Sequence, residues 1–499
     1  PEVVAQSSIA SLDVGASGAY VTAAIAWGHL WEGLFGQGQD YTSQPILVDT
    51  FDLSTDGLVW TFTLRDVDFH DGTPLTSNAA VASLQRHIGQ TQGKVLQGFL
   101  LGEEPLYEDG FTIIDGRTFK VNTVEPYGSL VDGWALITGG TSTVFTETAA
   151  AFAYGDEIGE DNYIGTGAYQ FKLWEPGNRI QLERYDRFVS RREPGSWFAG
   201  EKKAYVDTVT WFEIPAEETK IAGLQTGEWD FVDSIGLDFV AIMTADPDID
   251  ITWYPGHMWY FGFNQNEPLA DDINFRLAVQ KSMDGEAMLA SIGPPETWKL
   301  NCSIYGSGTV FESAAGCAEH YNQNDVDGAK AILAQSSYAG ETVTLMSPTD
   351  YSTITPVGFV IKDRMEEVGI NVDMPAMDWA TRISRTAGRD SVGWHLATSW
   401  GTIANRQNPA FSFLIAAGGV AFNNYYNAGM DDAHKAFLRT QDFDEQKALA
   451  DTMQLLFFQD PPQVYSGIFF MPSGFRTWVE NVVPEHNAIP LYNNVWLSR

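Results

Sequence analysis

Apolar and polar positions alternate over short stretches of this chain, and turn residues or longer segments with helical spacing separate these stretches. Residues 58–64 read Leu-Val-Trp-Thr-Phe-Thr-Leu, which predicts a strand, and turn residues follow at positions 69–74. The pattern next predicts a helix over residues 76–84. Its first turn has Thr76 and Ser77, and either hydroxyl can cap a helix.

The alternation typical of strands and the spacing typical of helices recur further along the chain. Residues 167–174 and 179–184 predict a hairpin around the Pro-Gly turn of residues 175–178. Residues 217–226 predict a helix that ends at Gly227. We also expect strands at 260–264, 369–374 and 464–471, and helices at 275–290, 329–333 and 360–368. This mixture predicts an α/β protein.

Length and composition fit a chain with more than one hydrophobic core. The sequence has 499 residues, of which 44% are hydrophobic and 19% charged. Single cores stop growing at roughly 250–300 residues, so two or three cores are expected. No stretch approaches the ~20 uninterrupted apolar residues of a membrane span. No basic segment followed by an apolar run opens the chain, so we expect that Pro1 follows a removed signal or that the chain is not exported.

The charge balance excludes one class of partner. The chain has 29 Lys and Arg against 65 Asp and Glu, which gives a net charge of −36. A surface this negative repels phosphate backbones, so no nucleic-acid partner is expected. We interpret the acidity as a means of solubility or an adaptation to salt, and it does not identify a ligand.

Cys302 and Cys317 are the two cysteines of the sequence. A disulfide between them would close a short loop and would imply an oxidising compartment, while two unbonded thiols are the alternative. His320 alone does not complete a tetrahedral zinc site with them, so no metal site is expected.

Catalytic signatures are absent from the sequence. It contains no phosphate-binding loop of the G-x-x-x-x-G-K-[ST] type, no H-E-x-x-H and no G-x-S-x-G. His70 and Asp71 are neighbours in a turn, where a structural role is the better interpretation than that of a base and its orienting acid. We therefore predict no catalytic residue, no cofactor and no enzymatic activity.

Aromatic residues give the sequence a better candidate for binding. It has 16 Trp and 19 Tyr, and aromatic side chains form the walls of many solute pockets. Trp400 precedes a polar loop that includes Gly401, Asn405 and Arg406. These residues predict a site for a small polar ligand, and an ordinary surface loop is the alternative.

Several separated segments together resemble one family. The chain is similar to the peptide/nickel family of ABC-transporter substrate-binding proteins, which includes dipeptide-, oligopeptide- and nickel-binding proteins. The segments that carry the resemblance follow the family's order: 60–65, 69–76 (Phe-His-Asp-Gly-Thr-Pro-Leu-Thr), 165–169 (Gly-Thr-Gly-Ala-Tyr), 183–184, 224–230, 263–264 and 275–284. Each segment is weak alone, and most are turns, caps and core faces. The resemblance therefore bears on fold and transport role more than on the ligand.

The resemblance implies a two-lobed α/β fold with a hinge, in which the lobes close on a ligand. The first lobe would comprise residues 1–40, 165–258 and 476–499, with an inserted subdomain at 41–164. The second lobe would comprise residues 259–475. The crossovers would lie near residues 258–263 and 470–475.

The resemblance also implies a function: capture of a peptide or another small polar solute outside the cytoplasmic membrane, in the periplasm, by a monomer that delivers it to a membrane ABC permease. Members that bind dipeptides have an acid in the loop after the Gly-Trp motif, for the ligand's ammonium group. Here Arg406 reverses that charge, which favours an anionic, sugar-like or opine-like ligand over a free dipeptide. The ligand-binding residues expected are Tyr20, Val21, Thr22, Trp27, Trp134, Trp400, Gly401, Asn405 and Arg406.

Two other functions remain open on the sequence. A secreted hydrolase of carbohydrate or peptide would need a paired acid and base in the cleft. The second of these functions is a receptor-interacting or chaperone-like use of the same scaffold.

Overall fold

The computed structural model divides the chain into two compact units. Unit 1 comprises Pro1–Tyr254 and Met471–Arg499, and unit 2 comprises Pro255–Phe470. The chain therefore passes between the units twice, within two long strands, β12 (Ile249–Phe263) and β17 (Gln463–Arg476). The structure describes residues 1–5, 9, 11–14, 20–88, 98–103, 107–136, 158–350, 353–386, 391–403, 406–410, 412, 424–483 and 491–499.

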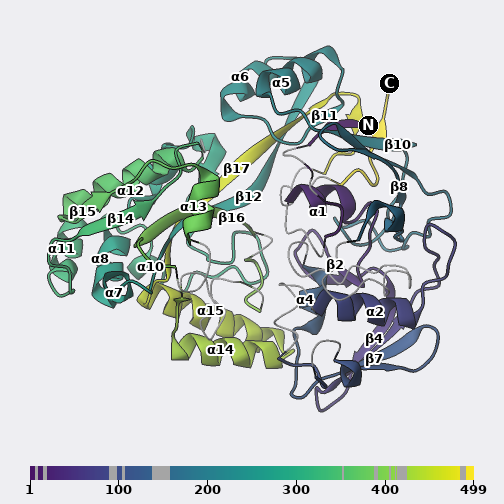
Figure 1. The fold of residues 1–499 in the computed structure, drawn as a ribbon, viewed down its shortest axis with the longest axis horizontal. Helices are drawn as coiled ribbons and strands as arrows, with labels where there is room; N and C mark the ends of the chain where they lie inside the picture. The colour runs from purple at the N-terminus through teal and green to yellow at the C-terminus, as the bar shows by residue number, and fades with distance from the viewer. Residues whose placement is uncertain are drawn as a thin grey trace. The chain divides into compact units, whose positions relative to one another are not determined.

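Unit 1 is built on one mixed sheet that joins both ends of the chain. Its strands run in the order β17, β11, β1, β10, β9, β8, and β1 pairs in parallel with both of its neighbours. The first and last residues of the chain accordingly lie close together on this unit (Figure 1). The strands are β1 (Glu2–Val4), β8 (Tyr169–Glu175), β9 (Arg179–Arg184), β10 (Thr208–Phe212) and β11 (Phe231–Val232), with α1 (Tyr20–Ala26), α5 (Glu217–Thr226) and α6 (Val240–Thr244) among the helices.

Unit 1 also contains a separate four-stranded antiparallel sheet. Its order is β4, β5, β7, β6. Strand β5 alternates half-buried and buried positions, as a strand with one face on a core does. The elements of residues 35–135 are β2 (Phe35–Gln37), β3 (Ser43–Pro45), β4 (Val48–Leu53), β5 (Val59–Leu64), α2 (Ser77–Ile88), β6 (Phe111–Ile113), β7 (Thr118–Asn122) and α4 (Leu130–Ala135). Elsewhere in the unit, β18 (Val479–Glu480) pairs with β19 (Trp496–Leu497).

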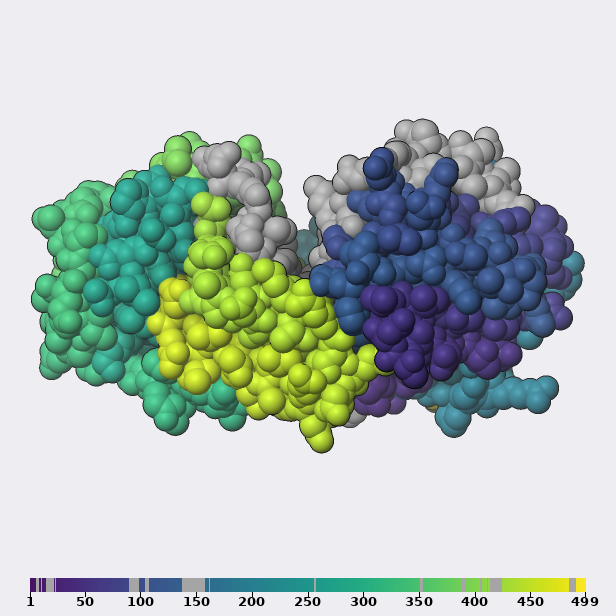
Figure 2. All heavy atoms as spheres, turned by 90° about the horizontal axis from the view of Figure 1, so that it is seen from below, coloured from purple at the N-terminus to yellow at the C-terminus, as the bar shows by residue number. Residues whose placement is uncertain are grey.

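Unit 2 has a second α/β core. Its strands run in the order β15, β14, β16, β12, β17, and β13 pairs with β17. Helices α14 and α15 pack against each other and form one continuous surface of this unit, drawn yellow-green in Figure 2. The elements are α7 (Pro268–Asp271), α8 (Ile273–Ser282), α9 (Gly285–Ala290), β13 (Trp298–Lys299), α10 (Cys317–His320), α11 (Val326–Leu333), β14 (Thr342–Met346), α12 (Thr355–Val368), β15 (Asn371–Asp373), α13 (Trp379–Thr386), β16 (Leu396–Thr402), α14 (Ala428–Arg439) and α15 (Phe443–Gln459).

Elements with local sequence signals are confirmed. The strand expected at 58–64 is β5, and the hairpin around the Pro-Gly turn is β8–β9. Helix α5 covers the expected residues and ends at Gly227, whose φ of 78° is the left-handed conformation that glycine adopts without strain. The helix at 76–84 is α2, and the Thr76 hydroxyl accepts a hydrogen bond from the Ala79 N–H at 3.1 Å.

The single helix expected over residues 275–290 is wrong. Two helices, α8 and α9, occupy this stretch, and the chain is extended at Met283 and Asp284 between them. The Asp284 carboxylate accepts a hydrogen bond from the Ala287 N–H at 2.9 Å and so starts a new helix. The apolar spacing of the sequence continues across the break, so periodicity alone did not reveal it.

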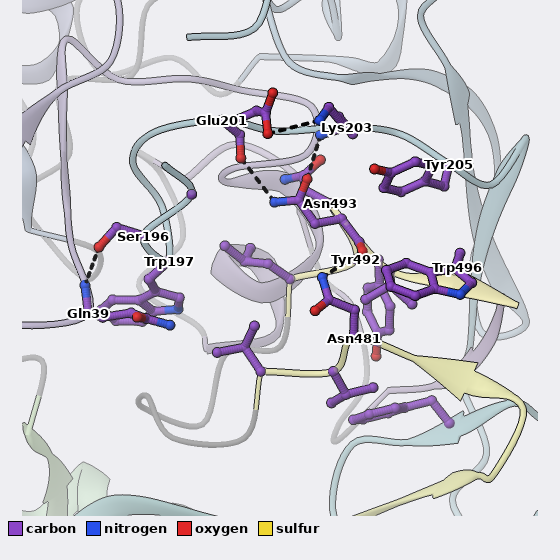
Figure 3. A pocket seen from close by; sticks show the side chains of 17 residues that line it. Gln39, Ser196, Trp197, Glu201, Lys203, Tyr205, Asn481, Tyr492, Asn493 and Trp496 are labelled. Carbon is purple, nitrogen blue, oxygen red and sulfur yellow. Dashed lines mark hydrogen bonds and ion pairs between the residues drawn. The ribbon is translucent and has the colours of Figure 1, made fainter. Parts of the chain in front are cut away.

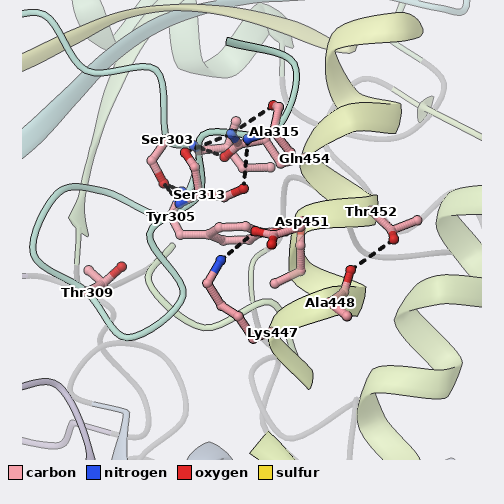
Figure 4. A network of polar contacts seen from close by, with 12 residues as sticks. Ser303, Tyr305, Thr309, Ser313, Ala315, Lys447, Ala448, Asp451, Thr452 and Gln454 are labelled. Atoms are coloured by element: carbon pink, nitrogen blue, oxygen red, sulfur yellow. Dashed lines mark hydrogen bonds and ion pairs between the residues drawn. The ribbon is translucent and has the colours of Figure 1, made fainter. Parts of the chain in front are cut away.

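Cys302 and Cys317 form a disulfide in unit 2, with their Cα atoms 5.8 Å apart. The loop that it closes is also fixed to α15 by the buried Gln454 (Figure 4). The Gln454 amide donates to the carbonyl oxygens of Ser313 at 2.9 Å and Ala315 at 3.1 Å, and its oxygen accepts from the Ile304 N–H at 3.1 Å. The loop is thus held by hydrogen bonds as well as by the covalent link.

Among the described residues, no helix is both long and apolar enough to cross a bilayer.

Candidate functional site

The candidate site lies in unit 2, where β16 ends beside β12. These strands pair antiparallel in a regular register, in which Trp400 is opposite Trp259, Gly401 opposite Met258 and Thr402 opposite His257. Successive side chains of a regular strand point to opposite faces. Trp400 and its neighbour Gly401 therefore face opposite sides of the sheet.

Trp400 forms an aromatic cluster with His257 and Phe469. The Trp400 and His257 rings meet edge to face with centroids 4.4 Å apart, and the imidazole stacks on Phe469 at 5.2 Å. His257 and Phe469 each lie within a few residues of a point where the chain passes between the units. Trp400 is half-buried and so can present part of its ring to a solute.

The His257 imidazole is neutral in this cluster. It is 2% exposed, and its burial lowers the pKa to about 3. Its Nδ1 atom has no hydrogen-bond partner among the residues that the structure describes. A neutral imidazole with a vacant nitrogen can either accept or donate one hydrogen bond, depending on its tautomer.

Arg406 lies on the other face of β16. Its guanidinium is completely buried, with its Cζ atom 4.2 Å from the ring centre of Tyr260 and 5.1 Å from that of Tyr465. Burial lowers its pKa to about 10, while Tyr260 acts in the opposite direction, so the group stays charged at neutral pH. The structure therefore separates Trp400 and Arg406 by the thickness of one strand.

Gly401 explains how the charge can sit so close to the strand. A Cβ atom at this position would lie 2.7 Å from Nη2 and 2.8 Å from Nε of Arg406. Any larger residue would displace the guanidinium. Only the backbone of β16 consequently stands between the buried charge and the face that carries Trp400.

Three other residues expected at the site are buried within unit 1. Trp27 is 1% exposed and packs on Phe198 at 4.3 Å, and Trp134 is 1% exposed and packs on Phe62 at 5.2 Å. Thr22 is fully buried, and its hydroxyl donates to the Ser11 carbonyl at 2.8 Å. These positions serve packing in the structure, and ligand contact by them stays a prediction.

The remaining expected residues give less information. Tyr20 and Val21 open helix α1, and their side chains lie outside the described part of the structure. Asn405 lies outside the described residues altogether.

His257 and Phe469 are the members of the cluster that the sequence reasoning missed. The sequence assigned no role to His257, and Phe469 lay in the strand expected at 464–471. The available signal was positional, because both residues belong to the long strands that connect the lobes in the expected fold. Their pairing with Trp400 depends on strand register, which no local motif reveals.

Metal binding gains no support from the described residues, in which no three His, Cys, Asp or Glu side chains gather into a group that could hold an ion. The architecture is instead that of a two-unit α/β binding protein whose chain crosses between the units in two long strands.

Comparison with known proteins identifies the family. A model described as "Bacterial extracellular solute-binding proteins, family 5 Middle" matches residues 42–422. The chain belongs to this family of bacterial extracellular solute-binding proteins. It is a non-enzymatic solute-binding protein of the ABC-transporter type, which excludes the hydrolase alternative.

Two relatives and one solved structure illustrate the range of the family. A "Probable peptide ABC transporter periplasmic-binding protein" of Sinorhizobium fredii is 27% identical over 494 residues, covering 95% of this chain and 90% of its own. A glutathione-binding protein of Pectobacterium atrosepticum is 26% identical over 450 residues, covering 87% and 82%. The periplasmic binding protein AgaA of A. tumefaciens, solved with agropinic acid, has a TM-score of 0.79 at 19% identity, covering 100% and 98%.

Proposed function

We propose that this chain captures a small amino-acid-derived anion, of the peptide or opine kind, and delivers it to a membrane ABC permease. The relatives named above concern a peptide, glutathione and agropinic acid, and solutes of this kind carry carboxylates. The observation that carries the proposal is the buried charge of Arg406 directly beneath the strand end that presents Trp400.

The electrostatics favour an anion at this point. The chain as a whole carries a net charge of −36, which repels anions at long range. A local positive charge is therefore needed to retain one. In a poorly solvated interior a charge acts more strongly than in water, so a carboxylate over β16 would be attracted through the thin backbone at Gly401. Trp400 would supply the apolar wall, and His257 a hydrogen bond.

The proposed setting of the protein is the periplasm, as a monomer, without a nucleic-acid partner. The disulfide between Cys302 and Cys317 supports an oxidising compartment, and the acidic composition argues against nucleic acid. We further propose that residues 41–164 are an inserted subdomain of the first lobe and that residues 476–499 return to that lobe. The separate sheet β4–β5–β7–β6 supports the insertion.

A thermal-shift screen tests the function. Dipeptides, glutathione, opines, neutral sugars and nickel–histidine complexes would be added to the full chain. A true ligand present at 100 times its dissociation constant stabilises the protein by about 2.7 kcal/mol. We expect this response from a carboxylate-bearing member of the panel.

Substitution then locates the site. Trp400→Ala should abolish the stabilisation by the ligand, whereas Trp174→Ala should preserve it. Trp174 is the matched control, since it is also a half-buried strand tryptophan but belongs to β8 of unit 1. A response to a carboxylate-bearing ligand that survives Trp400→Ala would refute the assignment of the site. A response that is limited to sugars or nickel and is lost in Trp400→Ala would refute the anionic solute.

A further inference from the structure

A cavity of about 310 Å³ lies wholly within unit 1, and none of its lining residues belongs to the candidate site in unit 2. Its walls come from two parts of the chain far apart in sequence: the loop of residues 195–205, and residues 481–483 and 491–496 near the C-terminus (Figure 3). Gln39 and Phe231 complete the lining. The volume is at the lower end of the roughly 300–1,000 Å³ range of ligand pockets.

The backbone around this cavity is held in uncommon conformations. Trp197, Asn481 and Asn494 line it and have φ values of 51°, 62° and 69°. Asparagine tolerates the left-handed region, but a bulky residue such as tryptophan adopts it rarely. Such strain persists only where the surrounding contacts impose it, and it is concentrated at binding and active sites.

Hydrogen bonds fix the walls in place without a ligand. The Asn494 amide donates to the Glu201 carbonyl at 3.0 Å, and its oxygen accepts from the Lys203 N–H at 2.8 Å. The Asn481 amide donates to the Asn494 carbonyl at 2.9 Å. These bonds join the C-terminal segment to the loop, so a ligand would enter a site that is already formed and would lose little affinity to ordering it.

The lining combines aromatic rings with uncharged polar groups. In Figure 3, Trp197 and Trp496 stand on opposite sides of the cavity, with Asn481 between them. Trp496 is 41% exposed and Tyr205 51%, and the two rings meet edge to face at 5.8 Å. Apolar ring surface of this kind remains available for a ligand to cover.

The charged groups at this cavity compensate one another. Glu201 and Lys203 form an ion pair at 2.9 Å, so the site favours neither an anion nor a cation. Asn481 and Asn494 add uncharged amide groups to the lining. A neutral polar ligand therefore fits this lining better than an ion does.

We propose that this cavity is a second binding site of the protein, for a neutral hydroxylated ring of monosaccharide size. The C–H faces of such a ring stack on aromatic side chains, and its uncharged hydroxyl groups suit the amide groups of the lining. The site belongs to unit 1 alone, so its existence does not depend on the solute proposed for the site at Trp400.

Saturation-transfer NMR and calorimetric titration with glucose, galactose, mannose and N-acetylglucosamine test the proposal on the full chain. At least one of these sugars should bind saturably. Trp496→Ala and Tyr205→Ala should each weaken its binding about tenfold, because each removes a stacking surface. Tyr426→Ala, at a side chain of unit 2 that is 64% exposed, is the matched control and should leave sugar binding unchanged.

Sugar binding measured with the Trp400→Ala variant distinguishes this site from the proposed solute site. Sugar binding that survives Trp400→Ala and weakens in Trp496→Ala supports the proposal, whatever solute the other site takes. Binding lost in Trp400→Ala but retained in both unit 1 variants would place the sugar in the other site and overturn the proposal. Failure of all four sugars to bind would overturn it as well. Near-UV circular dichroism of each variant establishes that it is folded.

Discussion

Lys202 in unit 1 and Arg406 in unit 2 are both buried cations, but different neighbours hold them. In unit 1, Lys202 is 2.9 Å from Glu32, and both side chains are 3% exposed. Arg86 is likewise paired with Asp13 in the interior of that unit. In unit 2, Arg406 is held between the rings of Tyr260 and Tyr465. An aromatic ring attracts a cation through its quadrupole but carries no charge of its own, so it leaves the field of the cation largely intact.

The difference indicates which buried charges serve the fold and which can serve function. A carboxylate within 3 Å cancels the charge of its partner, and the pair has little effect on a distant ligand. A guanidinium that lies on tyrosine rings can still act on a solute nearby. The comparison therefore predicts that substitutions at Lys202 and Arg406 have opposite consequences, the first on stability and the second on binding.

The largest effect is expected from Lys202→Met. The substitution leaves the Glu32 carboxylate buried without its cation, and breaking a buried pair in this way costs about 3–5 kcal/mol. The measurement is denaturant unfolding followed by a probe in unit 1. Changing Glu32 to Gln in the same chain should recover part of the loss, because it removes the uncompensated charge.

Lys172→Met is the matched control for Lys202→Met. Lys172 pairs with Glu183 at 3.3 Å, but the side chains are 44% and 38% exposed. An exposed pair contributes about 0–1 kcal/mol, so this variant should unfold almost as the parent does. Equal losses in the two variants would show that burial of the pair is not what makes Lys202 important.

A smaller effect, of another kind, is expected from Arg406→Met. Methionine fills much of the same volume and removes a charge whose burial is itself costly, so we expect a smaller loss of stability than in Lys202→Met. The dissociation constant of the anionic solute should rise by about tenfold, which corresponds to about 1.4 kcal/mol. Arg406→Lys keeps a positive charge and should preserve most of the affinity.

Titration calorimetry measures the affinity of Arg406→Met for the solute, and denaturant unfolding measures its stability. Unchanged affinity in Arg406→Met would mean that the charge does not act on the solute. A loss of stability as large as that of Lys202→Met would mean that Arg406 is a scaffold residue like Lys202, and the contrast between these two residues would fail.

The sequence predicted best the features that depend on neighbouring residues. Gly227 ends α5, and the Pro-Gly turn joins β8 to β9, because each signal acts within a few positions of the chain. Residues 275–290 were misjudged because the cap at Asp284 competes with an uninterrupted apolar period, and only the observed hydrogen bond decides between them.

The candidate site was predicted only in part, since it depends on register. The polar loop after Trp400 directed attention to this strand end, but neighbours along a strand face opposite sides of the sheet. Sequence proximity of Trp400 and Arg406 therefore did not mean that they meet. His257 and Phe469 come from β12 and β17, more than 60 residues away in each case, and no local pattern links them to Trp400.

The smallest effect concerns pH, and it has the same sign in both units. Burial lowers the pKa of three histidines of unit 1: that of His29 to about 3, and those of His70 and His87 to about 4. In unit 2, burial lowers the pKa of His257 to about 3 and also lowers the pKa of His395 and His434. Each folded pKa is below the unfolded value of about 6.5, so the unfolded chain takes up protons first as the pH falls. Stability is therefore fully present above pH 6.5 and declines as the pH drops toward 4.

His87→Gln should reduce this decline in unit 1. With a folded pKa of about 4, His87 lowers the free energy of unfolding by about 0.8 kcal/mol at pH 6 relative to pH 8, and the glutamine variant lacks this contribution. The measurement is the difference in unfolding free energy between pH 8 and pH 6, with a probe in each unit. An identical pH dependence in the parent and the variant would show that His87 titrates alike in the folded and unfolded chains. A smaller dependence confined to unit 1 is the expected result, because His87 contributes only to the unit in which it is buried.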